Sequence, residues 1–145
     1  MIKRILIVLL LSSMFGLYAI TAEDSLEELF SKNRPNDLVN IAGNLSAIGS
    51  LHQSKGDYPS ALNHYNKSLR IREQLGLEKT SGYALVLFLS SVAEFRLGNS
   101  CKAAGIAKNV VSIYQYLGQT EDAKLAEVQG LTSFREACQL LSENR

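Results

Sequence analysis

The sequence repeats a pattern of turn and helix residues at a spacing of 42 positions. The segment 55–61 (KGDYPSA) recurs as 97–103 (LGNSCKA), and the segment 74–76 (QLG) recurs as 116–118 (YLG). A fixed period of roughly 20–50 residues is typical of stacked supersecondary units, each of which buries an apolar face against its neighbour. The repeat therefore favours a layered array with a surface for another polypeptide over a compact enzyme core.

The pattern between the turns is helical. The chain is 46% hydrophobic and contains two prolines, and its long Leu- and Ala-rich stretches favour helices. No segment alternates apolar and polar residues as a half-buried strand would. We predict an all-α fold in which Asp57 caps the third helix, Thr120 caps the last, and glycines end the helices. The six expected helices cover residues 25–32, 37–55, 58–75, 81–97, 100–117 and 120–142.

The first 22 residues have the layout of a secretory signal peptide. Lys3 and Arg4 precede an uncharged, mostly apolar run from Ile5 to Ile20, and Thr21-Ala22 leads into an acidic segment. The run is short for a membrane span, which needs about 20 residues. We predict cleavage after Ala22, with no membrane attachment afterwards. An uncleaved anchor remains the alternative, because Ile20 is larger than the usual residue at that position.

Residues 42–72 resemble a tetratricopeptide repeat. The family pattern consists of a large apolar residue, a small residue at a helix crossing, a turn, a second small residue and an aromatic residue of the second helix. The residues that match it are Leu45, Ile48, Gly49, Gly56, Asp57, Tyr58, Ala61, Tyr65 and Leu69. The length of 42 is similar to the longer repeats of the kinesin-light-chain type. This resemblance implies a right-handed superhelical stack of antiparallel helix pairs. It divides the chain into a signal peptide (1–22), an N-terminal helix and linker (23–36) and a repeat domain (37–145) with units at 37–76, 79–118 and a capping helix at 121–142.

In this family the first helices of successive units line a concave groove. Three columns of outward-facing positions follow from the 42-residue step, namely Ser46, Phe88, Gly130; Ser50, Val92, Phe134; and Gln53, Phe95, Ala137. The candidate partner-binding residues are therefore Leu85, Phe88, Val92, Phe95, Leu131 and Phe134. Three interpretations stay open: an apolar groove for an amphipathic helix or extended peptide, self-association through the same patch, or packing of these residues on one another.

A polar column lies beside the apolar ones. His52, Glu94 and Glu136 follow one another at 42-residue steps, where the family usually has an aromatic residue. A histidine beside a carboxylate is the minimum for a pH switch or half a metal site. An ordinary hydrogen bond between His52 and Glu94 is the simpler expectation, and we predict no metal ion.

The two cysteines fall on neighbouring helices of the implied architecture. Cys101 begins a second helix and Cys138 lies near the end of the following first helix, where antiparallel helices meet. In an exported protein this placement predicts a disulfide, which closes a loop of about 37 residues and stabilises the fold by about 3–4 kcal/mol. Two unpaired, buried thiols are the alternative.

The sequence carries no motif for catalysis. It lacks H-E-x-x-H, C-x-x-C, a phosphate-binding loop and G-x-S-x-G, and its net charge of +1 includes no basic block for nucleic acid. We therefore expect an exported, periplasmic or secreted protein, on the assumption of a bacterial source. Its predicted function is non-enzymatic and needs no cofactor. It is an adaptor, chaperone-like or assembly factor that binds a peptide or protein partner in the groove, or else a subunit that self-associates.

Overall fold

The structure is a computed structural model that describes residues 28–143. The chain divides into two units, residues 1–38 and 39–145, and each is treated by itself. The described part of the first unit contains a helical turn at residues 28–32 and the start of α2 (Pro35–Ser54). The predicted signal peptide lies outside the described residues.

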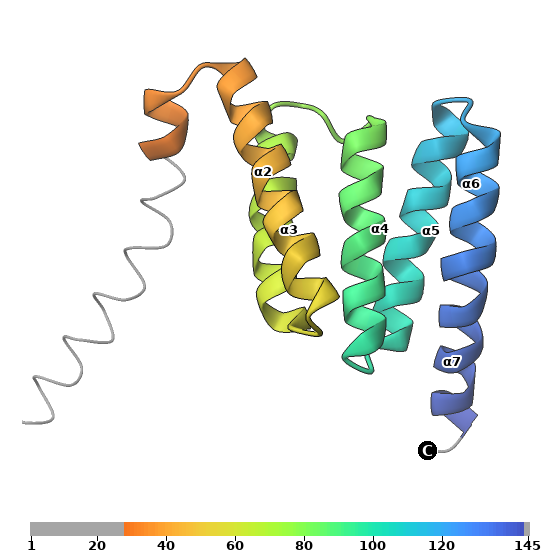
Figure 1. The fold of residues 1–145 in the computed structure, drawn as a ribbon. Helices are drawn as coiled ribbons and strands as arrows, with labels where there is room; N and C mark the ends of the chain where they lie inside the picture. The colour runs from red at the N-terminus through yellow and green to blue at the C-terminus, as the bar shows by residue number, and fades with distance from the viewer. Residues whose placement is uncertain (1–27, 144–145) are drawn as a thin grey trace, which may run out of the picture. The chain divides into compact units, whose positions relative to one another are not determined.

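The second unit consists of helices that pack pairwise in chain order (Figure 1). From Val39 onward α2 is followed by α3 (Tyr58–Gln74), α4 (Ser81–Arg96), α5 (Ser100–Tyr116) and α6 (Thr120–Ala126). A π-helical turn η1 (Glu127–Leu131) then leads into α7 (Thr132–Glu143). No strand occurs within residues 28–143, so the prediction of an all-α fold is confirmed for the part of the chain that the structure describes.

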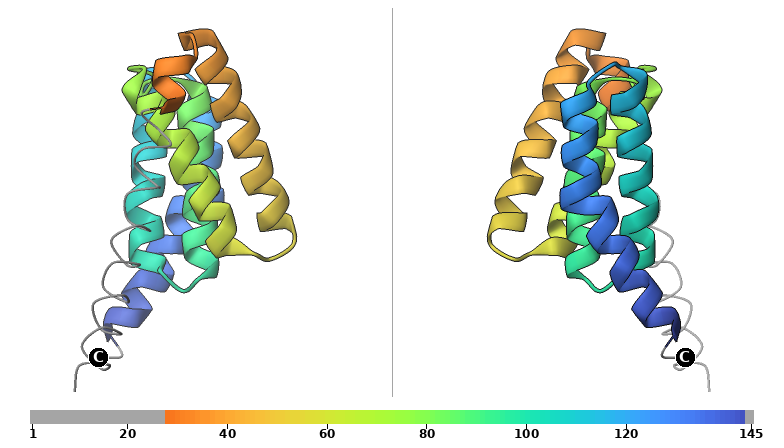
Figure 2. Two further views of the ribbon diagram at one scale, coloured as in Figure 1. Left: turned by 90° about the vertical axis from the view of Figure 1, so that its left-hand side faces the viewer. Right: turned by 90° about the vertical axis from the view of Figure 1, so that its right-hand side faces the viewer.

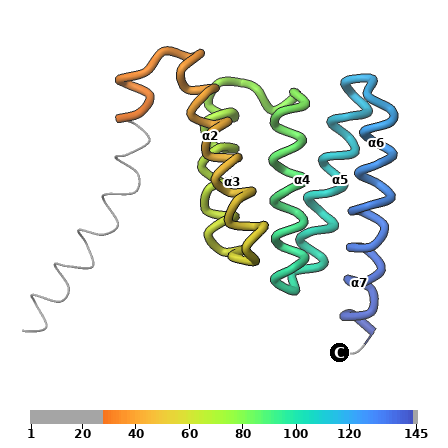
Figure 3. Tube along the Cα trace, viewed as in Figure 1, coloured from red at the N-terminus to blue at the C-terminus, as the bar shows by residue number. Residues whose placement is uncertain are grey.

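The turns repeat as the sequence repeats. Each of four helices ends at a glycine with φ between +70° and +86°, a backbone conformation that a residue with a Cβ rarely adopts; they are Gly56, Gly76, Gly98 and Gly118. Asp57 caps α3 as predicted, because its side chain accepts a hydrogen bond from the Ser60 N–H at 3.2 Å. The tube in Figure 3 shows short turns between most helices and a longer link between α3 and α4.

The last helix departs from the prediction in two ways. Thr120 is its first residue and not its cap, since the N-cap position is held by Gln119 without a side-chain hydrogen bond. The helix is also not a continuous α-helix, because the Thr132 N–H reaches back five residues to the Glu127 carbonyl. Figure 2 shows α6, η1 and α7 following one another as one long element that changes direction along its length.

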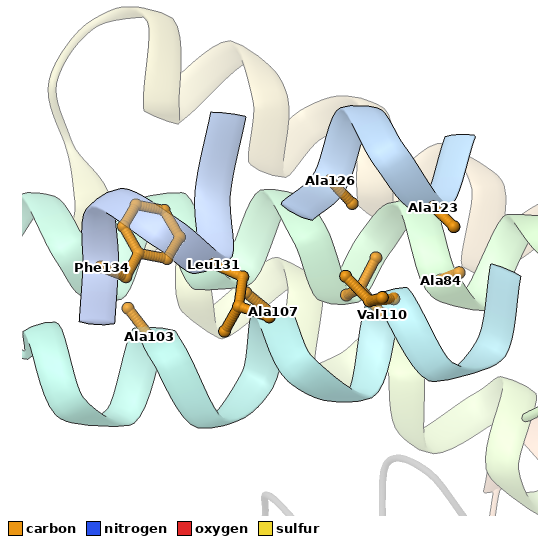
Figure 4. Close-up of a cluster of buried hydrophobic side chains, with 9 residues drawn as sticks. Ala84, Ala103, Ala107, Val110, Ala123, Ala126, Leu131 and Phe134 are labelled. Atoms are coloured by element: carbon orange, nitrogen blue, oxygen red, sulfur yellow. The ribbon is translucent and has the colours of Figure 1, made fainter. Parts of the chain in front are cut away.

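Small residues bring the helices of the second unit close together. One buried cluster joins α4, α5, α6 and α7. Five of its members are alanines, and larger side chains fill the remaining space (Figure 4). Its members are Ala84, Ala103, Ala107, Val110, Val111, Ala123, Ala126, Leu131 and Phe134. A second cluster joins α3 and α4 and consists of Ala61, Tyr65, Leu69, Tyr83 and Val86.

Two buried positions are filled by different residue types in the first and second repeats. Tyr65 is fully buried, and a Cβ on Gly49 would lie 2.6 Å from its ring. The equivalent pair 42 positions later is Ser91 and Ala107, both fully buried. The first pair combines a glycine with a tyrosine ring, whereas both residues of the second pair are small.

Candidate functional site

The apolar groove predicted from the sequence is partly filled by its own residues. Leu131 and Phe134 are only 5% and 4% exposed and belong to the core cluster. Phe88, Val92 and Phe95 are half-buried and pack against the same cluster. Of the six candidates only Leu85 is largely exposed, at 51%. The expectation that Leu131 and Phe134 offer surface to a partner is therefore wrong.

The π turn is the physical reason that Phe134 is buried. A turn of this kind accommodates one extra residue, and one residue corresponds to about 100° around an α-helix. Positions after the turn are therefore offset by one from the 42-residue register. Phe134 takes the place equivalent to the buried Ser91 and not the one equivalent to Val92. Its ring stacks on Phe95 with centroids 4.6 Å apart. Figure 4 shows Phe134 in the buried cluster, next to Ala103 of α5.

Gly130 lets a second aromatic residue approach the π turn. A Cβ at this position would lie 2.8 Å from the Phe88 ring, so only glycine leaves room for that ring in its present place. Phe88 thus rests on the backbone of η1. The predicted groove residues Phe88 and Gly130 contact each other, which is the self-packing alternative for this part of the groove.

A small open pocket remains between α4, α5 and α6. Its volume is about 180 Å³ and its lining is mainly apolar; we call it the Leu85 pocket, formed by Leu85, Phe88, Tyr114, Asp122, Leu125 and Ala126. Leu125 is 53% exposed and the neighbouring Val128 is 62% exposed. Burial, together with the Asp122 carboxylate, raises the pKa of Tyr114 above its ordinary value.

Sequence reasoning placed two of these residues and missed four. Leu85 and Phe88 were predicted from the register of α4. Leu125 was missed because the 42-residue step pairs it with Tyr83, which is buried in the second cluster.

The polar column does not form the expected cross-repeat pair. The His52 Nδ1 lies 3.0 Å from the Asp57 carboxylate, within its own helix pair. The Glu94 carboxylate accepts a hydrogen bond from the Asn99 side chain at 2.7 Å and pairs with the Lys102 ammonium at 2.6 Å. Asp57 and Asn99 are themselves equivalent at the 42-residue step. His52 and Glu94 therefore each bind the turn that follows their own helix, and the predicted His52–Glu94 contact is wrong.

The first helix pair brings the two histidines together. The rings of His52 on α2 and His64 on α3 stack with centroids 5.2 Å apart and planes inclined by 17°. Burial, reinforced by the charges of His52 and Lys67, lowers the pKa of His64, whose Nδ1 is buried without a hydrogen-bond partner. Within residues 28–143, no group of three or more metal-ligating side chains is placed to hold a metal.

The cysteines are joined as the sequence predicted. Cys101 at the start of α5 and Cys138 in α7 form a disulfide with a Cα–Cα distance of 4.7 Å. Cys101 is exposed and Cys138 is half-buried. The bond ties α7 to α5. Along α7, Phe134 lies between the π turn and Cys138.

Comparison with known proteins adds no relative to this description. No protein-family model matches the chain, and no curated protein matches it significantly. Between residues 28 and 143, none of the helices combines the length and apolar character that crossing a bilayer requires.

Proposed function

We propose that this chain is a tetratricopeptide-like repeat protein that acts as a non-enzymatic binding module. The repeated turns support this reading, as does a column of buried alanines at 42-residue steps, Ala42, Ala84 and Ala126. Small residues at one position of successive first helices allow these helices to stack closely, as the right-handed superhelix of that family requires. The proposed stack comprises residues 39–143 and ends at α7.

The Leu85 pocket is the proposed binding surface. The observation that carries the proposal is that two leucines, each about half exposed, line an open and mainly apolar pocket together with two aromatic residues, Phe88 and Tyr114. Asp122 is the only charged residue in its lining. The complementary ligand is a peptide that inserts one branched aliphatic side chain and places a basic residue against Asp122. Burial of one such side chain is worth about 1.5–3 kcal/mol.

A randomised peptide library provides the test. Peptides selected on the full chain are expected to share an aliphatic residue and a basic residue at a fixed spacing. The variant Leu125→Glu should weaken their binding by about tenfold or more, which corresponds to about 1.4 kcal/mol. The matched control is Leu51→Glu, since Leu51 on α2 is 55% exposed and lies outside the pocket. Equal losses in both variants would contradict the proposed surface.

Two further measurements complete this test. Asp122→Asn should remove the preference for a basic residue and leave the aliphatic preference intact. Sedimentation over a range of protein concentrations examines self-association, the runner-up function. A dimer that forms in the native protein and not in Leu125→Glu would assign the Leu85 pocket to a second copy of this chain.

Export is part of the same proposal. The layout of residues 1–22 supports it, and a disulfide is typical of proteins that leave the reducing cytosol. Sequencing the N-terminus of the protein recovered from its source should give Glu23 as the first residue. A periplasmic or secreted adaptor, chaperone-like factor or assembly factor is the role that fits these features.

A further inference from the structure

The disulfide lies in an open pocket and not in the core. A cavity of about 510 Å³ surrounds it, lined by Gly98, Asn99, Ser100, Cys101, Lys102, Cys138, Leu141 and Ser142. Cys101 is exposed, and Leu141 at the rim is 49% exposed. Both cysteines line this pocket, Cys101 exposed and Cys138 half-buried, so a dissolved thiol has a route to the bond that does not require unfolding of the surrounding helices.

The two sulfur atoms differ in their surroundings. Cys101 is the second residue of the 17-residue helix α5, so its sulfur lies at the helix end where N–H groups lack intrahelical partners. The Asn99 side chain does not cap these groups, because it donates to Glu94 instead. The helix terminus therefore favours a negative charge on Cys101. Cys138 is the seventh residue of α7, where the N–H groups are bonded within the helix.

This asymmetry decides the direction of thiol–disulfide exchange. In such a reaction the sulfur that forms the more stable thiolate leaves faster. We propose that the Cys101–Cys138 disulfide is an exchange site for a thiol, with Cys138 as the attacked sulfur and Cys101 as the leaving thiolate. The incoming thiolate forms a bond to the Cys138 Sγ, the Sγ–Sγ bond breaks, and its electron pair stays on Cys101. No further oxidant or reductant is consumed.

The exchange changes how the terminal helix is held. In the mixed disulfide α7 is no longer tied covalently to α5, and it remains attached through Leu131, Phe134 and the π turn. The incoming group is then bound to Cys138 on α7, in the pocket that Leu141 also lines. The site thus accepts either a free small thiol or a cysteine side chain of a polypeptide, and the chemistry is the same for both.

Glutathione and a cysteine-containing decapeptide are suitable probes for these two sources. The oxidised full chain is mixed with each probe, quenched with acid, alkylated with N-ethylmaleimide and mapped by mass spectrometry. The expected product carries the probe on Cys138 and the alkyl group on Cys101. Adduct mainly on Cys101, or no adduct with either probe, would overturn the proposal. If glutathione forms the adduct and the decapeptide does not, the partner is a small thiol. If both probes form the adduct, the site also accepts a cysteine of a polypeptide.

Two additional measurements separate native-state exchange from exchange through unfolding. The rate with glutathione should stay constant in sub-denaturing urea, whereas a rate that rises steeply with urea requires global unfolding and refutes the proposal. The single variants Cys138→Ser and Cys101→Ser each leave one thiol. Alkylation of Cys101 should reach half its maximal rate at least about one pH unit lower than alkylation of Cys138. Equal midpoints would remove the basis for the assigned direction.

Discussion

Substituting Gly49 by alanine tests the packing of α2 on α3. The added Cβ would lie 2.6 and 2.7 Å from two ring atoms of Tyr65 and 3.2 Å from the Ala61 carbonyl oxygen. The ring cannot easily move away, because Tyr65 is fully buried and its hydroxyl donates to Gln53 at 3.0 Å and lies 3.3 Å from Ser50. The substitution therefore forces a shift of the backbone or of a pinned ring.

The magnitude follows from two opposed effects. Overpacking of a well-packed site costs about 1–3 kcal/mol, and replacing glycine by alanine inside a helix returns about 1 kcal/mol. We expect Gly49→Ala to lower the free energy of unfolding by up to about 2 kcal/mol. Gly105→Ala is the matched control, since Gly105 is exposed within α5 and a Cβ there meets nothing within 4 Å. The control should gain about 1 kcal/mol.

Urea denaturation followed by circular dichroism measures both variants with the native chain. The free energies of unfolding of the two variants should differ by roughly 1–3 kcal/mol, with Gly105→Ala the more stable. A Gly49→Ala variant as stable as Gly105→Ala would refute the close contact with Tyr65. The double variant Gly49→Ala/Tyr65→Leu adds a coupling test, because the shorter side chain should recover part of the loss caused by the alanine.

Four further predictions follow from the core, the disulfide, the buried carboxylate and the histidine pair. Phe134→Ala should cost about 3–5 kcal/mol in urea denaturation, as for a core aromatic; a cost below about 1 kcal/mol would mean an exposed groove residue. The double variant Cys101→Ser/Cys138→Ser should lose about 4 kcal/mol, the closure entropy of a loop with a sequence separation of 37, and an unchanged stability would contradict the disulfide. Lys102→Met leaves the 5% exposed Glu94 without its cation and should cost about 1–3 kcal/mol, whereas Lys108→Met on the same helix should cost little. The pKa of His64 in the folded state lies below its ordinary 6.5, so between the folded-state pKa and 6.5 the unfolded chain binds more protons than the folded chain. The free energy of unfolding should therefore fall as the pH drops below 6.5 and level off beneath the folded-state pKa. His64→Gln should flatten this dependence in urea denaturation at a series of pH values.

Most of the helical framework could be predicted because the decisive residues act locally. The glycines Gly56, Gly76, Gly98 and Gly118 end helices through their own backbone conformation, and Asp57 caps α3 with its own side chain. The pairing of Cys101 with Cys138 also followed, since the repeat length fixes which helix ends meet. These features need only short-range chemistry and the period.

The groove could not be predicted because one residue changed its register. The 42-residue step assigns Phe134 to the column of Val92, and it is correct as far as Ala126, which is buried like Ala84. The π turn at Glu127–Leu131 then adds a residue. Nothing in the local sequence marks this turn except Gly130, whose role depends on Phe88 from another helix. A contact between distant segments therefore decides which face Phe134 takes.

The polar column shows a second kind of limit. Period alone placed His52 and Glu94 in one column, and neighbouring first helices come close enough for such a pair to be reasonable. In the structure each side chain finds a partner five residues later, Asp57 and Asn99 respectively. Short loops keep these partners near at little entropic cost, so the local bond prevails over the one between repeats.

The covalent link between α5 and α7 also determines how the chain responds to mechanical load. Tension applied at the C-terminus passes through Cys138 directly to Cys101, and the residues between them carry none of it while the disulfide is intact. With a sequence separation of 37 and an extended reach of about 3.4 Å per residue, roughly 125 Å of chain is withheld from extension. Reduction of one bond would release that length, so in a stretched molecule the disulfide sets how far the C-terminal end can travel.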